Sequence, residues 1–341
     1  MRFRPFATFA AAFAFVSFVS AAPGGLAASA PSSLADEAKV ARAWLTRINE
    51  AASTRNFVGT FVVSSSGRVV SSKIAHFVDG GEQLERVEAL DGQMRQVFRR
   101  NSEVTTIWPQ SNIAVVEQRD LLASFPALLQ AGGERIVEFY DVAAAGTDRV
   151  AGYEADVLQV KPRDALRYGY RLWAEKHSGL LLRAEVLDDQ DQVLESSAFS
   201  EVAIGVKPQP QTVLGALRHL DRYRVARPSM APVKLEAEGW SLRRPVPGFR
   251  QVSSVKRAVS APLDSGRHGQ EVLQAIFSDG LTYVSVFVEP FNPERHSQAM
   301  QTSLGATRTL MHRQGDWWVT VMGDVPAPTL RQFADGLERA N

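Results

Sequence analysis

Apolar residues follow two different periods in the first part of the chain. Near the start, five of them recur at helical spacing and predict one amphipathic helix: Ala41, Trp44, Leu45, Ile48 and Ala52. Beyond Asn56 the period changes to two, and strands are expected at 57–64, 69–78, 82–90, 94–100, 103–108 and 112–117. Glycine-containing turns such as Asp91-Gly92 separate several of these strands, which predicts an antiparallel meander.

A second set of alternating segments continues the sheet. A helical stretch is expected around 121–130, before the next strands. Those strands are expected at 135–142, 153–161, 167–174, 180–187 and 193–204. An antiparallel sheet of this length tends to curl, so its concave side needs a filling of helices or of a ligand.

The hairpin expected within 167–187 has one apolar face. Alternate positions supply that face, and its members are Tyr168, Tyr170, Leu172 and Leu182. Arg167 and Arg171 alternate with the tyrosines and are therefore expected on the opposite face. The function of this hairpin depends on whether a helix or a ligand covers its apolar face.

The pattern weakens after Val206, where prolines bracket a polar stretch. Residues 207–234 are expected to form a linker. Further strands are then expected at 239–243, 251–259, 271–277, 281–288 and 317–322. A final helix follows Pro326, with an apolar stripe made of Leu330, Phe333, Ala334 and Leu337. The expected fold class is α+β, with a large antiparallel domain at 28–206 and a small α+β domain at 235–341.

The N-terminus has the pattern of a secretory signal. Arg2 and Arg4 precede an uncharged apolar run at 6–19, and a stretch of small residues follows. The run is too short to span a membrane, so a signal peptide at 1–27 is expected, cleaved after Ala27. The alternative is an anchor that stays uncleaved. The expected product is an exported, soluble protein that begins near Ala28.

Charge and composition narrow the function classes. The chain has 38 basic and 37 acidic residues, and removal of Arg2 and Arg4 with the leader leaves 36 against 37, a formal net charge of −1. This balance argues against a general attraction to nucleic acid. The chain has no cysteine, so its stability has to come from apolar burial, and 45% hydrophobic residues provide enough material for two domains.

No catalytic motif is present in the sequence. The 6 histidines stand at no metal-ligand spacing, and there is no G-x-S-x-G elbow, Walker loop or dinucleotide fingerprint. The absence of cysteine excludes thiol catalysis. We therefore expect no catalytic, cofactor-binding or metal-binding residues, and an enzyme is not favoured.

Several segments carry a family resemblance. The stretch from Gly146 to Ser196, "GTDRVAGYEADVLQVKPRDALRYGYRLWAEKHSGLLLRAEVLDDQDQVLES", resembles the core block of the RseB/MucB family. Agreement extends to "NFVGTFVVS", "HFVDGGEQLERVEALDG", "FSDGLTYVSVFVEP", "TSLGATRTL" and "DWWVTVMGDVPAPTLRQFADGLE". The segments occur in the family's order over nearly all of the mature chain. Phe57, Val63 and Ser178 depart mildly from the family pattern.

The resemblance implies a periplasmic negative regulator of the sigma-E envelope-stress pathway. Its large domain would be similar to the lipoprotein carriers, a half-open β-barrel closed by helices. Its partner would be the periplasmic part of a membrane-spanning anti-sigma factor, which it would shield from the site-1 protease. Lipid or lipopolysaccharide is implied as the releasing signal, and a homodimer as the assembly. The alternative function is a periplasmic carrier of lipid or lipoprotein, although the additional C-terminal domain favours a protein partner.

In such a half-barrel the apolar face would line an acyl-sized cavity. The candidate lining residues are Phe57, Phe61, Tyr168, Tyr170, Leu172 and Leu182. Arg167 and Arg171 are candidate contacts to acidic groups of a partner. The alternative is that these aromatic side chains fill an ordinary core, because a sheet needs an apolar face whatever it binds.

Overall fold

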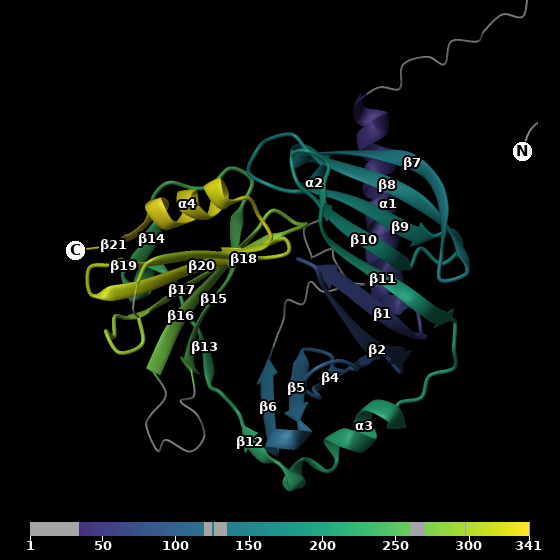
Figure 1. Ribbon diagram of the computed structural model, residues 1–341, viewed down its shortest axis with the longest axis horizontal. Helices are drawn as coiled ribbons and strands as arrows, with labels where there is room; N and C mark the ends of the chain where they lie inside the picture. The colour runs from purple at the N-terminus through teal and green to yellow at the C-terminus, as the bar shows by residue number, and fades with distance from the viewer. Residues whose placement is uncertain (1–33, 119–124, 126–134, 260–269, 297, 341) are drawn as a thin grey trace, which may run out of the picture.

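The computed structural model describes residues 34–118, 125, 135–259, 270–296 and 298–340 (Figure 1). The first elements are α1 (Leu34–Thr54), β1 (Phe57–Ser65), β2 (Arg68–Asp79), β3 (Glu82–Ala89), β4 (Gln96–Arg100), β5 (Glu103–Trp108), η1 (Pro109–Ser111) and β6 (Ile113–Gln118). Next come α2 (Ile136–Phe139), β7 (Tyr140–Val150), β8 (Tyr153–Pro162), β9 (Gly169–Glu175), β10 (Leu181–Leu187) and β11 (Val193–Ile204). They are followed by α3 (Gln211–Leu217), η3 (Leu220–Arg222), β12 (Arg224–Ala226), β13 (Met230–Pro232), η4 (Glu236–Glu238) and β14 (Trp240–Leu242). The last elements are β15 (Arg250–Val259), β16 (Gln270–Ser278), β17 (Tyr283–Pro290), β18 (Met300–Leu304), β19 (Thr307–Gln314), β20 (Trp317–Gly323), α4 (Ala327–Gly336) and β21 (Leu337–Arg339).

Two main sheets organise these elements. The N-terminal sheet has 12 strands in the order β12-β6-β5-β4-β3-β2-β1-β11-β10-β9-β8-β7. The C-terminal sheet has 7 strands in the order β13-β15-β16-β17-β20-β19-β18, and β14 pairs separately with β21. We call each sheet with its helices the N-terminal unit and the C-terminal unit. The predicted α+β class, a large antiparallel sheet followed by a smaller α+β unit, is confirmed.

Two meanders meet at β1 in the N-terminal sheet. Phe57 of β1 lies opposite His76 of β2 on one side and Ile204 of β11 on the other. The predicted hairpin is formed by β9 and β10, with Leu172 opposite Ala184. The strands are antiparallel except that β12 pairs in parallel with β6.

Helices cover opposite faces of the N-terminal sheet. Successive strand residues point to opposite faces. Ile74 and Phe77 of β2 are three positions apart, so their side chains point to opposite faces of the sheet. Ile74 lies in the apolar cluster that contains Leu45 and Ile48 of α1, whereas Phe77 lies in the cluster that contains Val213 of α3. We call these two sides the α1 face and the α3 face. Figure 1 shows α1 lying across β7 to β10.

The C-terminal unit packs α4 on one face of its sheet. Leu330 and Phe333 are fully buried in a cluster with Val319 and Val321 of β20. The predicted final helix is therefore confirmed, except that Leu337 begins β21 rather than continuing the helix. Among the described helices none is long and apolar enough to span a bilayer.

Some predicted elements differ from the observed ones. The strand expected at 135–142 begins only at Tyr140, because α2 occupies the preceding residues. The hairpin of β18 and β19 was not predicted. The interval 207–234 contains α3, β12 and β13, so the chain leaves the N-terminal sheet after Ala226 and joins the C-terminal sheet at Met230. The helix expected at 121–130 falls, apart from Phe125, outside the described residues.

Candidate functional site

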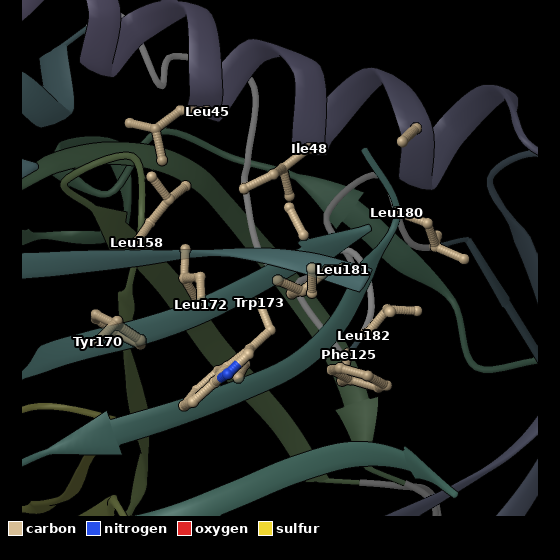
Figure 2. Close-up of a cluster of buried hydrophobic side chains, with 14 of the residues drawn as sticks. Leu45, Ile48, Phe125, Leu158, Tyr170, Leu172, Trp173, Leu180, Leu181 and Leu182 are labelled. Carbon is tan, nitrogen blue, oxygen red and sulfur yellow. The ribbon is translucent and has the colours of Figure 1, made fainter. Parts of the chain in front are cut away.

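Five of the six candidate cavity residues lie together on the α1 face. The buried members of this cluster are Phe57, Tyr170, Leu172 and Leu182, and Phe61 packs against them. Figure 2 shows Leu45 and Ile48 of α1 on the side of the strands to which Leu172 points. The apolar face of the hairpin is thus covered along much of its length by the first helix. That these residues also line an acyl-binding cavity remains a prediction.

An aromatic group extends the cluster toward β1. The ring of Phe125 lies 5.6 Å from that of Phe61 and 5.1 Å from that of Phe199, measured between centroids. Phe57 stacks on His76 at 5.1 Å, and the His76 ring hydrogen-bonds the carbonyl of Arg55 at 2.9 Å. These contacts give His76 a structural role in the core.

The tyrosine end of the hairpin faces the C-terminal unit. The Tyr168 hydroxyl accepts a hydrogen bond of 3.1 Å from Nε of Arg308 on β19. Burial raises the pKa of Tyr170 far above its usual value, and the charges of Asp324 and Asp279 act in the same direction. Tyr168 is therefore an interdomain contact, and Tyr170 lies where the core of one unit meets acidic residues of the other.

Arg167 is the centre of the contact between the units. Its Nε donates to Asp279 at 2.9 Å, and neither side chain is exposed at all. Its Nη2 donates to the carbonyl of Pro247 at 2.7 Å, and Nη1 pairs with Asp164. The guanidinium also lies 4.7 Å from the ring centroid of Phe139. Arg167 is therefore buried between the two units in this arrangement, and its predicted contact with a partner protein, which would compete with these contacts, remains a prediction.

Arg171 lies on the outer side of the hairpin, as its parity predicts. Its Nη1 is 3.3 Å from Oε2 of Glu185, whose other oxygen, Oε1, accepts from Arg183. The side chain of Arg171 is 36% exposed, whereas that of Glu185 is 4% exposed. A contact between Arg171 and a partner remains a prediction, and it would compete with this internal pair.

Asp279 organises the turn that meets Arg167. Its Oδ2 accepts a second hydrogen bond of 2.9 Å from the Tyr140 hydroxyl, whose pKa is raised by burial and then by the Asp279 charge. Its Oδ1 accepts the backbone N–H groups of Leu281 and Thr282, both at 2.9 Å. The buried carboxylate is thus fully hydrogen-bonded, as a buried charge requires.

Each unit inserts an apolar side chain into the other. Leu281, next to the Asp279 turn, belongs to the buried cluster under α1. Leu166, next to Arg167, packs against the buried cluster of the C-terminal unit. The Thr329 hydroxyl of α4 donates to the carbonyl of Leu166 at 2.7 Å. The junction is therefore an integral part of both cores.

A second contact joins the turn between β18 and β19 to the turn between β1 and β2. The N–H of Gly305 donates to Oγ of Ser66 at 2.8 Å. Close by, burial raises the pKa of Glu195, and the Asp324 charge raises it further. Burial also raises the pKa of Asp324, although a hydrogen bond of 2.6 Å from Thr307 opposes the shift. Two desolvated carboxyl groups, one from each unit, therefore lie close enough to repel each other at this contact.

Two cavities are lined by described residues. One, of about 530 Å³, lies between α3 and strands β1, β2 and β11, with Val58, Ala75 and Phe77 among its apolar lining and Lys73 at its margin. The other, of about 410 Å³, lies where Ser64–Gly67 approaches Ser303 and Arg308. None of the six candidate lining residues contributes to either cavity.

Sequence reasoning missed Asp279, Tyr140, Glu195 and Asp324. The Asp279-Gly280 pair has the composition of an ordinary hairpin turn, although the apolar Leu281 directly after it is unusual for an exposed turn. Nothing in the sequence pairs Arg167 with a carboxylate 112 positions away. Among the described residues no group of three or more His, Cys, Asp or Glu side chains is placed to hold a metal ion.

Comparison with protein families covers both units. Residues 40–217 match the model of the MucB/RseB N-terminal domain, and residues 234–338 match that of the MucB/RseB C-terminal domain. The chain is 30% identical over 309 residues to the sigma factor AlgU regulatory protein MucB of Pseudomonas aeruginosa, covering 88% of this chain and 91% of that protein. It is 25% identical over 297 residues to the sigma-E factor regulatory protein RseB of Escherichia coli, covering 87% and 90%.

Solved structures agree with this result. A crystal structure of MucB in complex with the periplasmic part of MucA matches with a TM-score of 0.65 and 27% identity, covering 88% of this chain and 99% of that one. The crystal structure of MucB alone matches with a TM-score of 0.64 and 26% identity, covering 88% and 98%. Both matches extend across the N-terminal and C-terminal units.

Proposed function

Because the chain belongs to the MucB/RseB family, we propose that it binds the periplasmic region of a membrane-spanning anti-sigma factor and shields it from the site-1 protease. The relatives carry the names of sigma-factor regulatory proteins, so the family is one of regulators rather than enzymes. The observation that supports the proposal most is the match to MucB in its complex with periplasmic MucA, which covers 88% of this chain. Binding would restrain release of the sigma-E factor, and it would take place in the periplasm after cleavage of residues 1–27.

A binding and protection experiment tests this proposal. The mature chain would be titrated with the periplasmic domain of the MucA homologue from the same organism, and the heat of binding measured. Saturable binding is expected, and addition of the chain is expected to slow site-1 cleavage of the full periplasmic segment. Absence of both effects would contradict the proposal, whereas binding without protection would contradict only the shielding role.

We further propose that lipid or lipopolysaccharide releases the partner. The apolar cluster under α1 supports this, because its buried side chains, Leu182 among them, would give methylene groups an apolar environment if the cluster opened. Adding lipopolysaccharide or a long-chain fatty acid to the preformed complex is expected to displace the anti-sigma segment. The carrier alternative predicts instead that lipid co-purifies with the chain and that no anti-sigma segment binds.

A further inference from the structure

Four strands form the edges of the two main sheets, and one of them is unprotected. Edge strands present unpaired backbone groups, which proteins usually protect by short length, charge, proline or a bulge. β12 and β13 have only 3 residues each, and β13 ends in Pro232. β7 carries Asp148 and Arg149 and has a register shift between Ala144 and Thr147. β18 has 5 residues, no charge and no proline.

β18 offers both backbone and side chains to solvent. All of its residues are exposed, including Met300 at 50% and Leu304 at 57%. Among the described strands it pairs only with β19, and Leu304 lies opposite Thr307 across a two-residue turn. Because that closing pair is hydrogen-bonded and the antiparallel ladder alternates, Gln301 and Ser303 turn their N–H and C=O groups outward.

Positive charge lies beside this edge. Arg308 faces Ser303 in the register, and Arg331 of α4 donates to Oε1 of Gln301 at 3.3 Å. Within the described part of the chain, Arg308 donates to the Tyr168 hydroxyl and neither guanidinium is paired with a carboxylate. The outward backbone of β18 is therefore flanked by two arginines that lack an acidic partner.

The polar cavity at the end of β18 adds to this surface. Ser303, Gly305 and Arg308 line one side of its volume of about 410 Å³, and residues 64–67 line the other together with Val193, Leu194 and Ser196 of β11. Serine hydroxyls and a guanidinium are hydrogen-bond donors that suit a carboxylate. The cavity can therefore offer hydrogen-bonding partners to a polar side chain of a segment that runs along β18.

We propose that β18 docks an extended, acidic segment of a partner protein by strand addition. The proposal rests on the proposed function, since the partner there is the periplasmic region of an anti-sigma factor. Backbone hydrogen bonds would come from Gln301 and Ser303, and Arg308 and Arg331 would pair with acidic side chains. A second copy of this chain fits the edge less well, because it would bring the same arginines against each other.

The test removes one outward N–H group without touching the ladder to β19. In Ser303→Pro the ring replaces an N–H that points to solvent, which edge strands tolerate. The matched control is Ser303→Ala, which keeps the N–H and loses only the hydroxyl. With the periplasmic domain of the MucA homologue as the probe, we expect binding to weaken about tenfold or more in Ser303→Pro and only slightly in Ser303→Ala. Circular dichroism and thermal melting check that both variants fold.

Charge reversal provides an independent measurement that alters no backbone group. Arg331→Glu is expected to weaken binding of the probe several-fold, whereas the remote, exposed Arg222→Glu is expected to leave it unchanged. If Ser303→Pro does not fold, the comparison of Arg331→Glu with Arg222→Glu still tests whether β18 is the docking edge. Binding by Ser303→Pro equal to that of the parent would overturn the docking edge and leave the proposed function standing. Failure of the parent itself to bind would overturn both the docking edge and the proposed function. A concentration-dependent dimer that is lost in Ser303→Pro would show instead that β18 binds a second copy of the chain.

Discussion

Replacing Arg167 by methionine should strongly weaken the junction between the two units. The guanidinium is completely buried, and it is the cationic partner of an equally buried Asp279. Methionine keeps most of the apolar volume between the Phe139 and Phe249 rings, so the loss is mainly electrostatic. Breaking a buried ion pair by removing one partner typically costs about 3–5 kcal/mol, because an uncompensated charge is left behind.

The structure places the expected cost near the lower end of that range. Asp279 would still accept the Tyr140 hydroxyl and the N–H groups of Leu281 and Thr282. These three donors support the carboxylate, so we expect a loss of about 3 kcal/mol in the free energy of unfolding. Adding Asp279→Asn to the Arg167→Met variant removes the buried charge and should restore part of this loss.

Urea denaturation, followed by circular dichroism and tryptophan fluorescence, measures the effect. The parent is expected to unfold in one transition because each unit contributes to the core of the other, and Arg167→Met is expected to separate the transitions. The matched control is Arg163→Met, in the same loop, whose pair with Asp141 is 48% and 66% exposed. Exposed pairs contribute about 1 kcal/mol or less. A single transition in Arg167→Met, with a loss no larger than that of Arg163→Met, would refute the structural role assigned to Arg167.

Three further predictions concern the contacts between the two units and the chain that joins them. Gly248→Ala should lower the melting temperature clearly, because Gly248 has φ +84° and its added Cβ would meet the Arg167 guanidinium and the Phe139 ring. An unchanged melting temperature would contradict the close packing of Gly248 against Arg167. Glu195 and Asp324 have raised pKa values, so the folded state loses stability as the pH rises from their ordinary pKa values through the raised ones. Asp324→Asn should therefore stabilise the protein relative to the parent more at pH 7 than below the ordinary aspartate pKa of 3.8, and an equal difference under both conditions would argue against burial as the cause. Limited digestion with a nonspecific protease should cut first within 227–229, between β12 and β13, and a first cut between β1 and β10 would contradict the proposed division into 28–206 and 235–341.

Strand alternation predicted the faces of the N-terminal sheet but not what covers them. Tyr170, Leu172 and Leu182 share a face, as their parity requires. Alternation records only that a face is apolar, so the same pattern results whether a helix, a ligand or another domain lies on it. Here α1 covers Leu172, whereas the end of the hairpin at Tyr168 meets the C-terminal unit.

The missing parts of the prediction have a common physical origin. β18 was not recognised because all of its residues are exposed, so its side chains carry no apolar and polar alternation. The Arg167 and Asp279 pair could not be predicted because its members are 112 positions apart and no local pattern links them. Contacts of this kind depend on which surfaces the fold brings together. Hydrophobic periodicity along the sequence reveals burial only where side chains of one helix or strand are buried at regular intervals.

The junction between the units lies next to the proposed docking edge, which links it to regulation of binding. The contact at Gly305 and Ser66 lies at the turn that ends β18, and the cavity next to it is lined by residues of both units. A segment docked on β18 would therefore contact the N-terminal unit as well, so its affinity depends on how the two units are held together. A signal that loosens the contact between the units would then lower the affinity without competing for β18 itself. Arg167→Met provides that condition without lipid, so it should weaken binding of the anti-sigma segment although no atom of Arg167 lies at the docking edge.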